Sequence, residues 1–244
     1  MEFYTIASSS AGNAALVCHE DTHILIDAGV SCRRITQSLA ALDLTLEDID
    51  AILITHEHID HVRALGTLQK KCAVPLYASR GTAAALDYPA ERVHAFTPGD
   101  ALTVGSLRAL PFRTSHDARE SVGYRIESGD GSLAVLTDTG YITDEAHDLA
   151  LGADTLLLEA NHDVEMLTTG PYPYPLKRRI ASDSGHLSND SSALEARTLV
   201  DSGTTRLVLG HLSKENNHPE LARETVRSEL TLAGMAEGGD YLLS

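Results

Sequence analysis

The chain has 244 residues, which suits one large domain or two small ones, and we expect a single domain over 1–244. Hydrophobic residues make up 43% of it and charged residues 22%, so disordered, collagen-like and low-complexity classes are excluded. The 35 acidic residues outnumber 19 basic ones, and the formal net charge of −16 disfavours a general nucleic-acid coat protein because it repels phosphates. A local basic patch or bound metal cations would still attract an anionic substrate.

Several features bear on location and cofactors. No run approaches the roughly 20 apolar residues that span a bilayer, and the first residues lack a signal-peptide pattern, so we expect a cytoplasmic protein with no membrane partner. Cys18, Cys32 and Cys72 lack the paired spacing of a zinc knuckle or redox motif, and we expect them reduced and buried. The 12 histidines beside 3 Phe and no Trp indicate metal binding.

The first part of the chain alternates short apolar runs with helical patterns. A Thr45-x-x-Asp48 capping signal opens a short helix before the run at 51–55. Apolar, β-branched runs predict strands at 3–7, 14–18, 23–27, 51–55 and 74–78. Amphipathic stretches predict helices at 32–42, 61–72 and 82–87.

The middle of the chain predicts strands only, and the last part alternates again. The strands are expected at 93–96, 101–104, 107–113, 122–128 and 133–137, then at 155–160, 206–210 and 240–243. Helices are expected from about 192, opened by Ser192-x-x-Glu195, and after Pro219, whereas 161–190 is expected to be irregular. About a dozen strands with helices at both ends predict an α+β fold of two sheets packed face to face, with the helices outside.

A dense group of metal-binding side chains follows the strand at 51–55. The sequence Thr55-His56-Glu57-His58-Ile59-Asp60-His61 places four good ligands within six positions. In an extended loop His56 and His58 project to one side and can share a metal, whereas Asp60 and His61 fall at the next turn and can face a second. Two ions about 3.5 to 4 Å apart need more than these four ligands.

Further ligands are expected where other predicted strands end, because sites on such sheets collect at the carboxyl ends of strands. His116 follows the strand at 107–113, Asp138 follows 133–137, and His211 follows 206–210. The complete set is then five His and two Asp. For His116 alone, a surface or capping role remains an alternative.

These motifs resemble a known family. Residues 55–61 look like the H-x-H-x-D-H signature of the metallo-β-lactamase fold, and LIDAG at 25–29, His116, TDTG at 137–140 and Gly210-His211 are similar to its other motifs, in the expected order. The resemblance covers the whole chain and implies an αββα sandwich of two mixed β-sheets flanked by helices, with two divalent metal ions. Zinc is expected from the ligand types, and manganese also suits carboxylate ligands.

The resemblance also implies a role for each ligand. His56, His58 and His116 would hold one metal, Asp60, His61 and His211 the other, and Asp138 would bridge the two. Asp27 would accept hydrogen bonds from the ligand loop. A simple turn carboxylate before Gly29 is the alternative.

Longer motifs indicate a branch of this family. The runs at 159–163, 170–180, 185–190 and 210–217 resemble the YycJ/WalJ-type branch, whose members are generally described as exonucleases. The run at 8–13 departs mildly from the usual Gly-Ser-x-Gly-Asn form, which affects only local loop geometry. The resemblance implies a dinuclear metal-dependent phosphodiesterase, an exonuclease with a nucleic acid substrate, DNA in preference to RNA.

Basic and aromatic residues suit such a substrate. Lys177, Arg178 and Arg179 form the densest basic run, and Tyr172 and Tyr174 lie between prolines before it. Aromatic rings can stack on bases while basic side chains follow phosphates. A stiff surface loop with a solvated basic helix is the alternative reading.

Proton transfer needs a group that the metals do not occupy. His186 and His162 each sit in a polar turn, and we expect His186 to protonate the leaving oxygen, with His162 the next candidate and Asp60 contributing from the second metal. Each histidine could instead be a hydrogen-bonded loop residue. Residues 139–210 leave no room for the inserted domain of large two-domain nucleases, so loops or a second subunit of a homodimer would clamp substrate.

Three rival functions share parts of this pattern. A thioester or small-ester hydrolase is favoured by the acidic surface and disfavoured by the basic run at 177–179. An electron-transfer di-iron protein would typically carry Glu at the position of His58 and a flavin domain. A binding module with an inactive site conflicts with the full ligand set.

Overall fold

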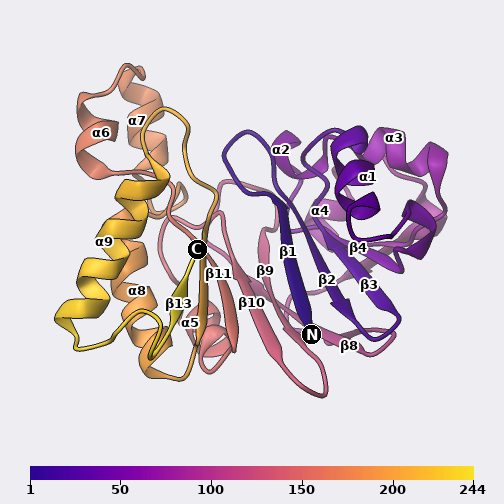
Figure 1. Ribbon diagram of the computed structural model, residues 1–244. Coiled ribbons are helices and arrows are strands. Elements are labelled where there is room, and N and C mark those ends of the chain that lie inside the picture. Colours follow the sequence, from indigo (N-terminus) through magenta and orange to yellow (C-terminus); the bar gives the residue numbers. More distant parts are fainter. The chain divides into compact units, whose positions relative to one another are not determined.

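A computed structural model describes residues 1–244 (Figure 1). The chain divides into two compact units, which are described separately below. The first unit comprises Met1–Pro111, Ala118–Val122 and Ile126–Asp130, and the second comprises Phe112–Asp117, Gly123–Arg125 and Gly131–Ser244. None of the helices has both the length and the apolar composition that crossing a membrane requires.

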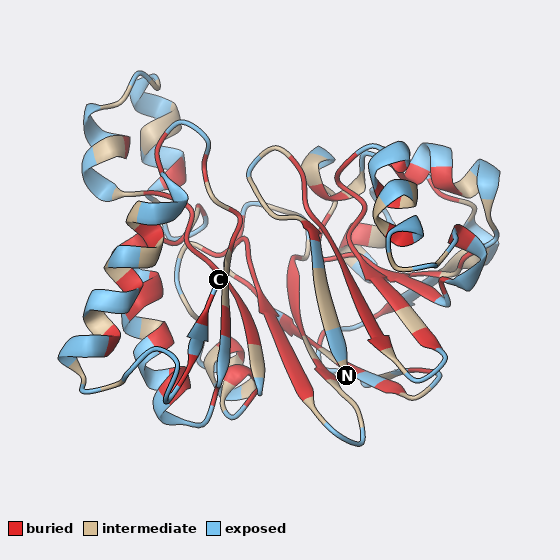
Figure 2. Ribbon diagram, viewed as in Figure 1, coloured by how far each residue is buried: buried red, intermediate tan, exposed pale blue.

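The first unit is built on a six-stranded sheet with the strand order β1-β2-β3-β4-β5-β6. Strands β1 to β3 pair antiparallel, and β3 to β6 pair parallel. Apolar residues of β2 and β4 are buried on both faces, as Figure 2 shows for β2, which explains why their sequences read as continuous apolar runs. The strands are β1 (Glu2–Ala7), β2 (Ala14–His19), β3 (Thr22–Ile26), β4 (Ala51–Leu53), β5 (Leu76–Ser79) and β6 (Val93–Phe96).

Helices of the first unit pack on this sheet through regularly spaced apolar residues. The Ser31 side chain caps α1 (Cys32–Ala40) by accepting from the Arg34 amide, and Ile35 and Leu39 of this helix enter the core. Leu65 and Leu68 of α3 (Leu65–Lys71) join the same core. The other helical segments are η1 (Leu46–Asp48), α2 (Ile59–Val62), α4 (Arg80–Ala83) and η2 (Ala90–Arg92).

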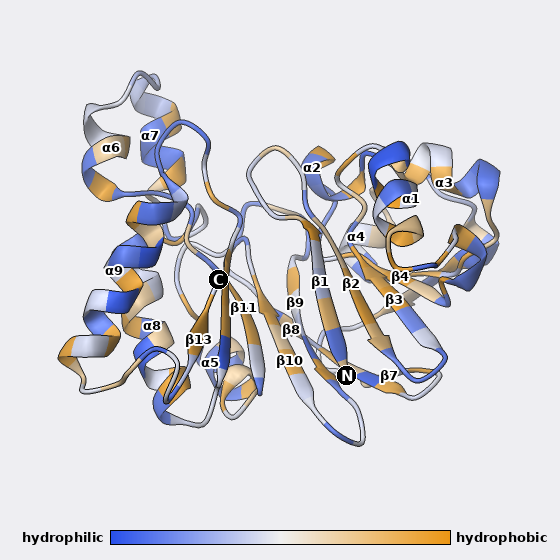
Figure 3. Ribbon diagram, viewed as in Figure 1, coloured by the Kyte–Doolittle hydropathy of each residue, from blue (hydrophilic) through white to orange (hydrophobic).

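The second sheet has the strand order β13-β12-β11-β10-β9-β8-β7. Strands β10 to β13 pair parallel, which places the ends of three consecutive strands, and the residues after them, at one edge. Figure 3 shows apolar residues along β10, which is buried throughout. The strands are β7 (Leu102–Val104), β8 (Leu107–Arg113), β9 (Val122–Glu127), β10 (Ser132–Leu136), β11 (Thr155–Glu159), β12 (Arg206–Gly210) and β13 (Leu242–Leu243).

Five helices belong to the second unit. Helices α8 (Asn189–Asp201) and α9 (Pro219–Leu232) lie side by side (Figure 1) and contribute Leu199 and Val226 to the core of this unit. The others are α5 (Asp144–Ala150), α6 (Val164–Thr169) and α7 (Tyr174–Ile180).

Most predicted strands and helices agree with the structure, and four differences stand out. The helix expected at 61–72 is two helices, α2 and α3, and the segment 161–190 contains α6 and α7 instead of being irregular. Helix α5 was not predicted. Helix α8 begins at Asn189 because the Ser188 hydroxyl caps it by accepting from the Ser191 amide, so the Ser192 signal lies one turn inside.

Candidate metal centre

In the first unit, the loop after β4 brings its four predicted ligands together. The ring centroids of His56 and His58 are 4.6 Å apart, and those of His56 and His61 are 4.1 Å apart. The Asp60 Oδ2 atom lies 3.5 Å from Nε2 of His61. His56 and His61 are fully buried, as a site shielded from bulk water requires.

Asp27, directly after β3, orients this cluster. Its carboxylate accepts hydrogen bonds from the backbone amide and hydroxyl of Thr55, both at 2.9 Å, and lies 2.7 Å from Nδ1 of His61. A carboxylate only accepts, so the His61 proton is on Nδ1 and the Nε2 lone pair remains available for a metal. Asp27 therefore acts on the ligand loop, as the family motif implied, and is more than a turn carboxylate.

The loop at 8–13 also contacts the ligand loop. The Asn13 amide nitrogen donates to the carbonyl oxygen of Asp60 at 2.8 Å, and Asn13 Nδ2 lies 3.0 Å from His61 Nε2. The segment Ser8-Ser9-Ser10, where the sequence departs from the usual family motif, is followed by a turn in which Gly12 N donates to the Ser9 carbonyl at 3.0 Å. The sequence analysis identified the motif at 8–13 but did not identify Asn13, its last residue, as a functional residue.

In the second unit, the three predicted strand-end ligands also meet. Asp138 Oδ1 lies 3.7 Å from Nε2 of His116 and 3.3 Å from Nε2 of His211. Nδ1 of His116 donates to the Gly185 carbonyl at 3.0 Å, which again leaves Nε2 for a metal. Burial lowers the pKa of His116, so its imidazole stays neutral and able to coordinate.

Glu159, at the carboxyl end of β11, completes this arrangement, and sequence reasoning missed it. Its Oε1 lies 2.7 Å from Nδ1 of His186 and 2.9 Å from Nδ1 of His211, and its Oε2 accepts from the Thr139 amide at 2.9 Å. Full burial alone would raise the pKa of Glu159, but the nearby His186 charge and the hydrogen bonds from His186 and His211 outweigh burial and lower it. Glu159 is therefore an ionised carboxylate that orients two imidazoles.

His186 lies between α7 and α8, beside the ligands of this unit. Its ring centroid is 5.0 Å from those of both His116 and His211. The potential ligand atoms of Asp138, Glu159, His186 and His211 all lie within 4.8 Å of one another, so His186 is close enough to act on the same chemistry.

His162 differs from His186. It is 3% exposed, its Nδ1 has no hydrogen-bond partner, and burial lowers its pKa to about 4. An imidazole that is neutral near pH 7 is a poor proton donor, so its environment disfavours His162 as the general acid.

The predicted substrate residues lie on or next to α7 and differ in their availability. Arg179 forms a bidentate ion pair with Asp117, at 2.5 and 2.9 Å, and Lys177 Nζ donates to the Thr168 carbonyl at 2.7 Å. Arg178 is exposed, Tyr174 is 72% exposed, and Tyr172 is half-buried. Arg178 and Tyr174 are thus the most accessible members of the group.

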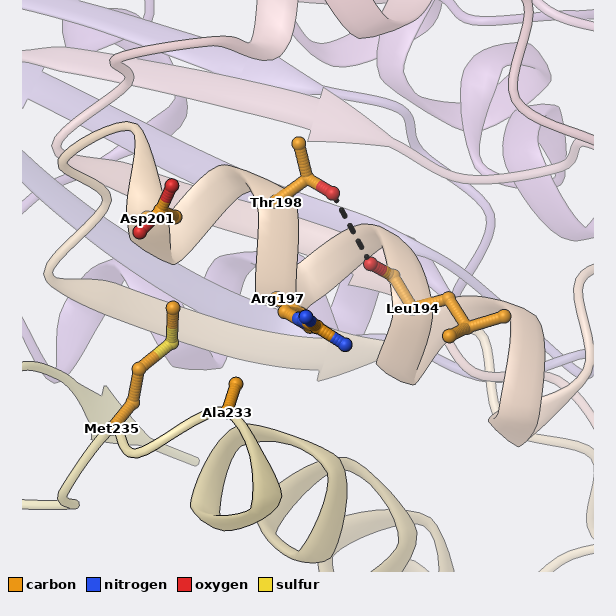
Figure 4. Close-up of a pocket in the computed structure, with 6 residues that line it drawn as sticks. All are labelled: Leu194, Arg197, Thr198, Asp201, Ala233 and Met235. Atoms are coloured by element: carbon orange, nitrogen blue, oxygen red, sulfur yellow. Dashed lines mark hydrogen bonds between the residues drawn. The ribbon is translucent and has the colours of Figure 1, made fainter.

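The second unit also contains a pocket of about 480 Å³ whose lining includes no histidine (Figure 4). It is formed by α8 and the residues that follow α9. Six residues line it: Leu194, Arg197, Thr198, Asp201, Ala233 and Met235. None of the predicted metal ligands lines this pocket, and Asp201 is its only residue of a type that commonly binds metal. The pocket is therefore not the candidate metal centre.

The family is established by sequence. Residues 22–212 match the model of the beta-lactamase superfamily domain. The chain belongs to the beta-lactamase superfamily, in the branch of the YycJ and WalJ proteins. It is 37% identical to exodeoxyribonuclease YycJ of Bacillus anthracis over 243 residues and 40% identical to exodeoxyribonuclease WalJ of Streptococcus pneumoniae over 247. Each alignment covers 98% of this chain and 92% of the relative.

A solved structure agrees on the fold. The metallo-β-lactamase fold protein YhfI of Bacillus subtilis matches with a TM-score of 0.75 at 20% identity, covering 94% of this chain and 92% of YhfI. The expected fold class, two mixed sheets flanked by helices, is confirmed.

Proposed function

We propose that this protein is a metal-dependent exonuclease that hydrolyses phosphodiester bonds of nucleic acid, with DNA preferred to RNA. The observation that carries the proposal is the identity of 37 to 40% to two exodeoxyribonucleases over 98% of the chain. Hydrolysis at a divalent-metal centre is the chemistry of this fold, and the His and Asp clusters of this chain fit it. With it we propose a single functional domain and a cytoplasmic location, and a substrate clamp formed by loops of this domain or by a second subunit of a homodimer.

The donor set supports two metal ions. By the order of the family motifs, we assign His56, His58 and His116 to one ion, Asp60, His61 and His211 to the other, and Asp138 to both. Nδ1 of His61, His116 and His211 is in each case hydrogen-bonded to a carboxylate or carbonyl, so Nε2 is the ligand atom. When bound, such ions activate water as a nucleophile and neutralise charge on the phosphoryl group. Zinc suits the imidazole-rich set, and manganese is the alternative.

His186, oriented by Glu159, supplies the proton for the leaving oxygen. Because Nδ1 of His186 donates to Glu159, the other ring nitrogen is the one that can deliver a proton to substrate. The negative charge of Glu159 stabilises the protonated imidazole before transfer and fixes the ring afterwards. Asp60 contributes to catalysis as a ligand of the second metal. His162 is the second candidate for the proton donor, after His186.

Substrate binding is assigned to α7 and the residues before it. Arg178 is the first candidate for a phosphate contact because it is exposed. Tyr174 and Tyr172 offer ring faces on which bases can stack. Lys177 and Arg179 contribute positive charge while their hydrogen bonds hold the helix in place.

The test is an assay of the purified protein with Mn or Zn on end-labelled DNA and RNA, beside a panel of thioesters. We expect nucleotides to be released from DNA ends faster than from RNA, and closed circular single-stranded DNA to resist. Cleavage of the circle would contradict exonuclease action. Activity on thioesters without nuclease activity would replace the proposal with the esterase alternative.

A further inference from the structure

Glu57 stands between two ligands, His56 and His58, yet its side chain makes a different set of contacts. Its Oε1 accepts from the backbone amide of Arg119 at 2.8 Å, and its Oε2 accepts from the Thr82 hydroxyl at 3.3 Å. The rings of His56 and His58 lie beside each other, at a centroid distance of 4.6 Å, so the residue between them points away from that pair. Glu57 therefore ties the ligand loop to the segment 118–122.

This segment is also held after Arg119, through Glu120 and Val122. The Glu120 carboxylate accepts from Gly81 N at 2.8 Å, and its carbonyl accepts from the Ser79 hydroxyl at 2.6 Å. Val122 N donates to the Thr55 carbonyl at 3.0 Å, directly before the first ligand. The approach at Gly81 is close, because a Cβ there would lie 2.6 Å from Cβ of Glu120.

The Arg119 side chain is exposed and forms no hydrogen bond or ion pair. Some other arginines of this acidic chain pair with carboxylates, among them Arg108 with Glu127 and Arg197 with Glu229. In a protein of formal net charge −16, a guanidinium without a carboxylate partner is a local attractor for anions, and here it belongs to a residue whose backbone amide is held by Glu57 of the ligand loop. Its fixed backbone also lowers the entropy lost when it binds one.

We propose that Arg119 binds a phosphate that flanks the scissile phosphate, and that Glu57 is a positioning residue for it. The inference rests on the proposed nuclease function. A flanking phosphate fits better than the scissile one because the backbone of Arg119 is anchored to Glu57, whose side chain points away from the His56 and His58 imidazoles. Arginine suits this role because its planar fork matches phosphate oxygens bidentately.

The experiment compares Arg119→Gln and Arg119→Lys with wild type on a labelled oligonucleotide and on bis(p-nitrophenyl) phosphate. We expect Arg119→Gln to raise KM for the oligonucleotide about 10-fold and to reduce the slope of log kcat/KM against log salt by about one. The loss on the small diester, which has no flanking phosphate, should be much smaller. Arg119→Lys should keep the salt slope and recover part of the KM. Arg33→Gln is the matched control, since Arg33 is also exposed on the first unit but lies on α1.

Glu57→Gln tests the positioning role. We expect a smaller rise in KM than for Arg119→Gln, an unchanged metal content, and a double variant no worse than Arg119→Gln alone, because both changes act through one contact. Additive losses would overturn the role of Glu57.

The outcomes for the inference and for the proposed function are distinct. If wild-type protein degrades nucleic acid while Arg119→Gln matches Arg33→Gln in KM and salt slope, the inference is wrong and the function stands. Equal losses on both substrates would show that Arg119 does not act on a flanking phosphate. An inactive wild-type protein would refute the function, and the inference with it.

Discussion

The carbonyl oxygen of Asp60 occupies the space beside Gly29 in which a side chain would begin: a Cβ at position 29 would lie 1.5 Å from that oxygen. Neighbouring amides hold the contact, since Ala28 N donates to the His61 carbonyl at 2.7 Å. The turn after β3 and the ligand loop are therefore in direct backbone contact, which no residue other than glycine at position 29 permits.

Gly29→Ala should displace the backbone of residues 60 and 61. Forcing extra atoms into a packed region typically costs about 1–3 kcal/mol, so we expect a lower unfolding free energy in urea and less bound metal. Gly66→Ala is the control, because nothing lies within 4 Å of a Cβ there and the position is helical, so it should be neutral or stabilising. Equal stability of both variants would contradict the prediction.

Glu159→Gln should weaken metal binding although it replaces none of the seven assigned ligands. Loss of a partner that orients a ligating histidine typically lowers metal affinity about 10- to 100-fold, and His211 loses a charged acceptor here. Competition with a chelator measures the affinity. Glu165→Gln, exposed on α6, is the matched control and should behave as wild type.

His186→Ala should lose activity according to the leaving group. General acid catalysis is typically worth about 100- to 10,000-fold, so we expect that loss on a diester with a poor alkoxide leaving group and much less on a nitrophenyl diester. Metal content should be unchanged. If one metal equivalent disappears, His186 is a ligand and one of the seven assigned ligands is wrong; equal losses on both substrates would make His186 a phosphate-binding group.

Protein purified without chelator should contain close to two metal equivalents by elemental analysis, because the chain offers seven candidate donors. His58→Ala and Asp138→Ala should each lose metal, and chelator treatment of wild type should abolish hydrolysis. A variant that retained both ions and full activity would remove that residue from the site.

Arg178→Gln and Arg179→Gln should have different effects. Arg178 is exposed, and its loss should weaken DNA binding and lower the salt slope by about one with little change in stability. Arg179 is 51% exposed and paired with Asp117, so its loss should also lower the unfolding free energy, by less than about 1 kcal/mol. Neutralising 177–179 together should affect DNA far more than a small diester; an equal loss on both would indicate a folding defect.

The sequence located the strands, and therefore most of the site, because apolar runs and the polar residues that end them are local patterns. His116, Asp138 and His211 were found by that rule, and the same rule applied to the run at 155–160 would have identified Glu159. Helices α5, α6 and α7 have seven residues or fewer, too short for a clear periodicity, so packing determines them. The pairing of Arg179 with Asp117 joins residues 62 positions apart, which local patterns do not reveal.

Asp27, Asp138 and His211 have φ angles of 58°, 58° and 52°, in the left-handed region that favours glycine. An L-residue there typically costs about 1–2 kcal/mol. Directed evolution that selects only for resistance to heat should accordingly accumulate glycine at these three positions and return sturdier proteins with impaired metal centres. Thermostabilisation of this enzyme should therefore keep all three residues fixed and draw its gains from elsewhere in the chain.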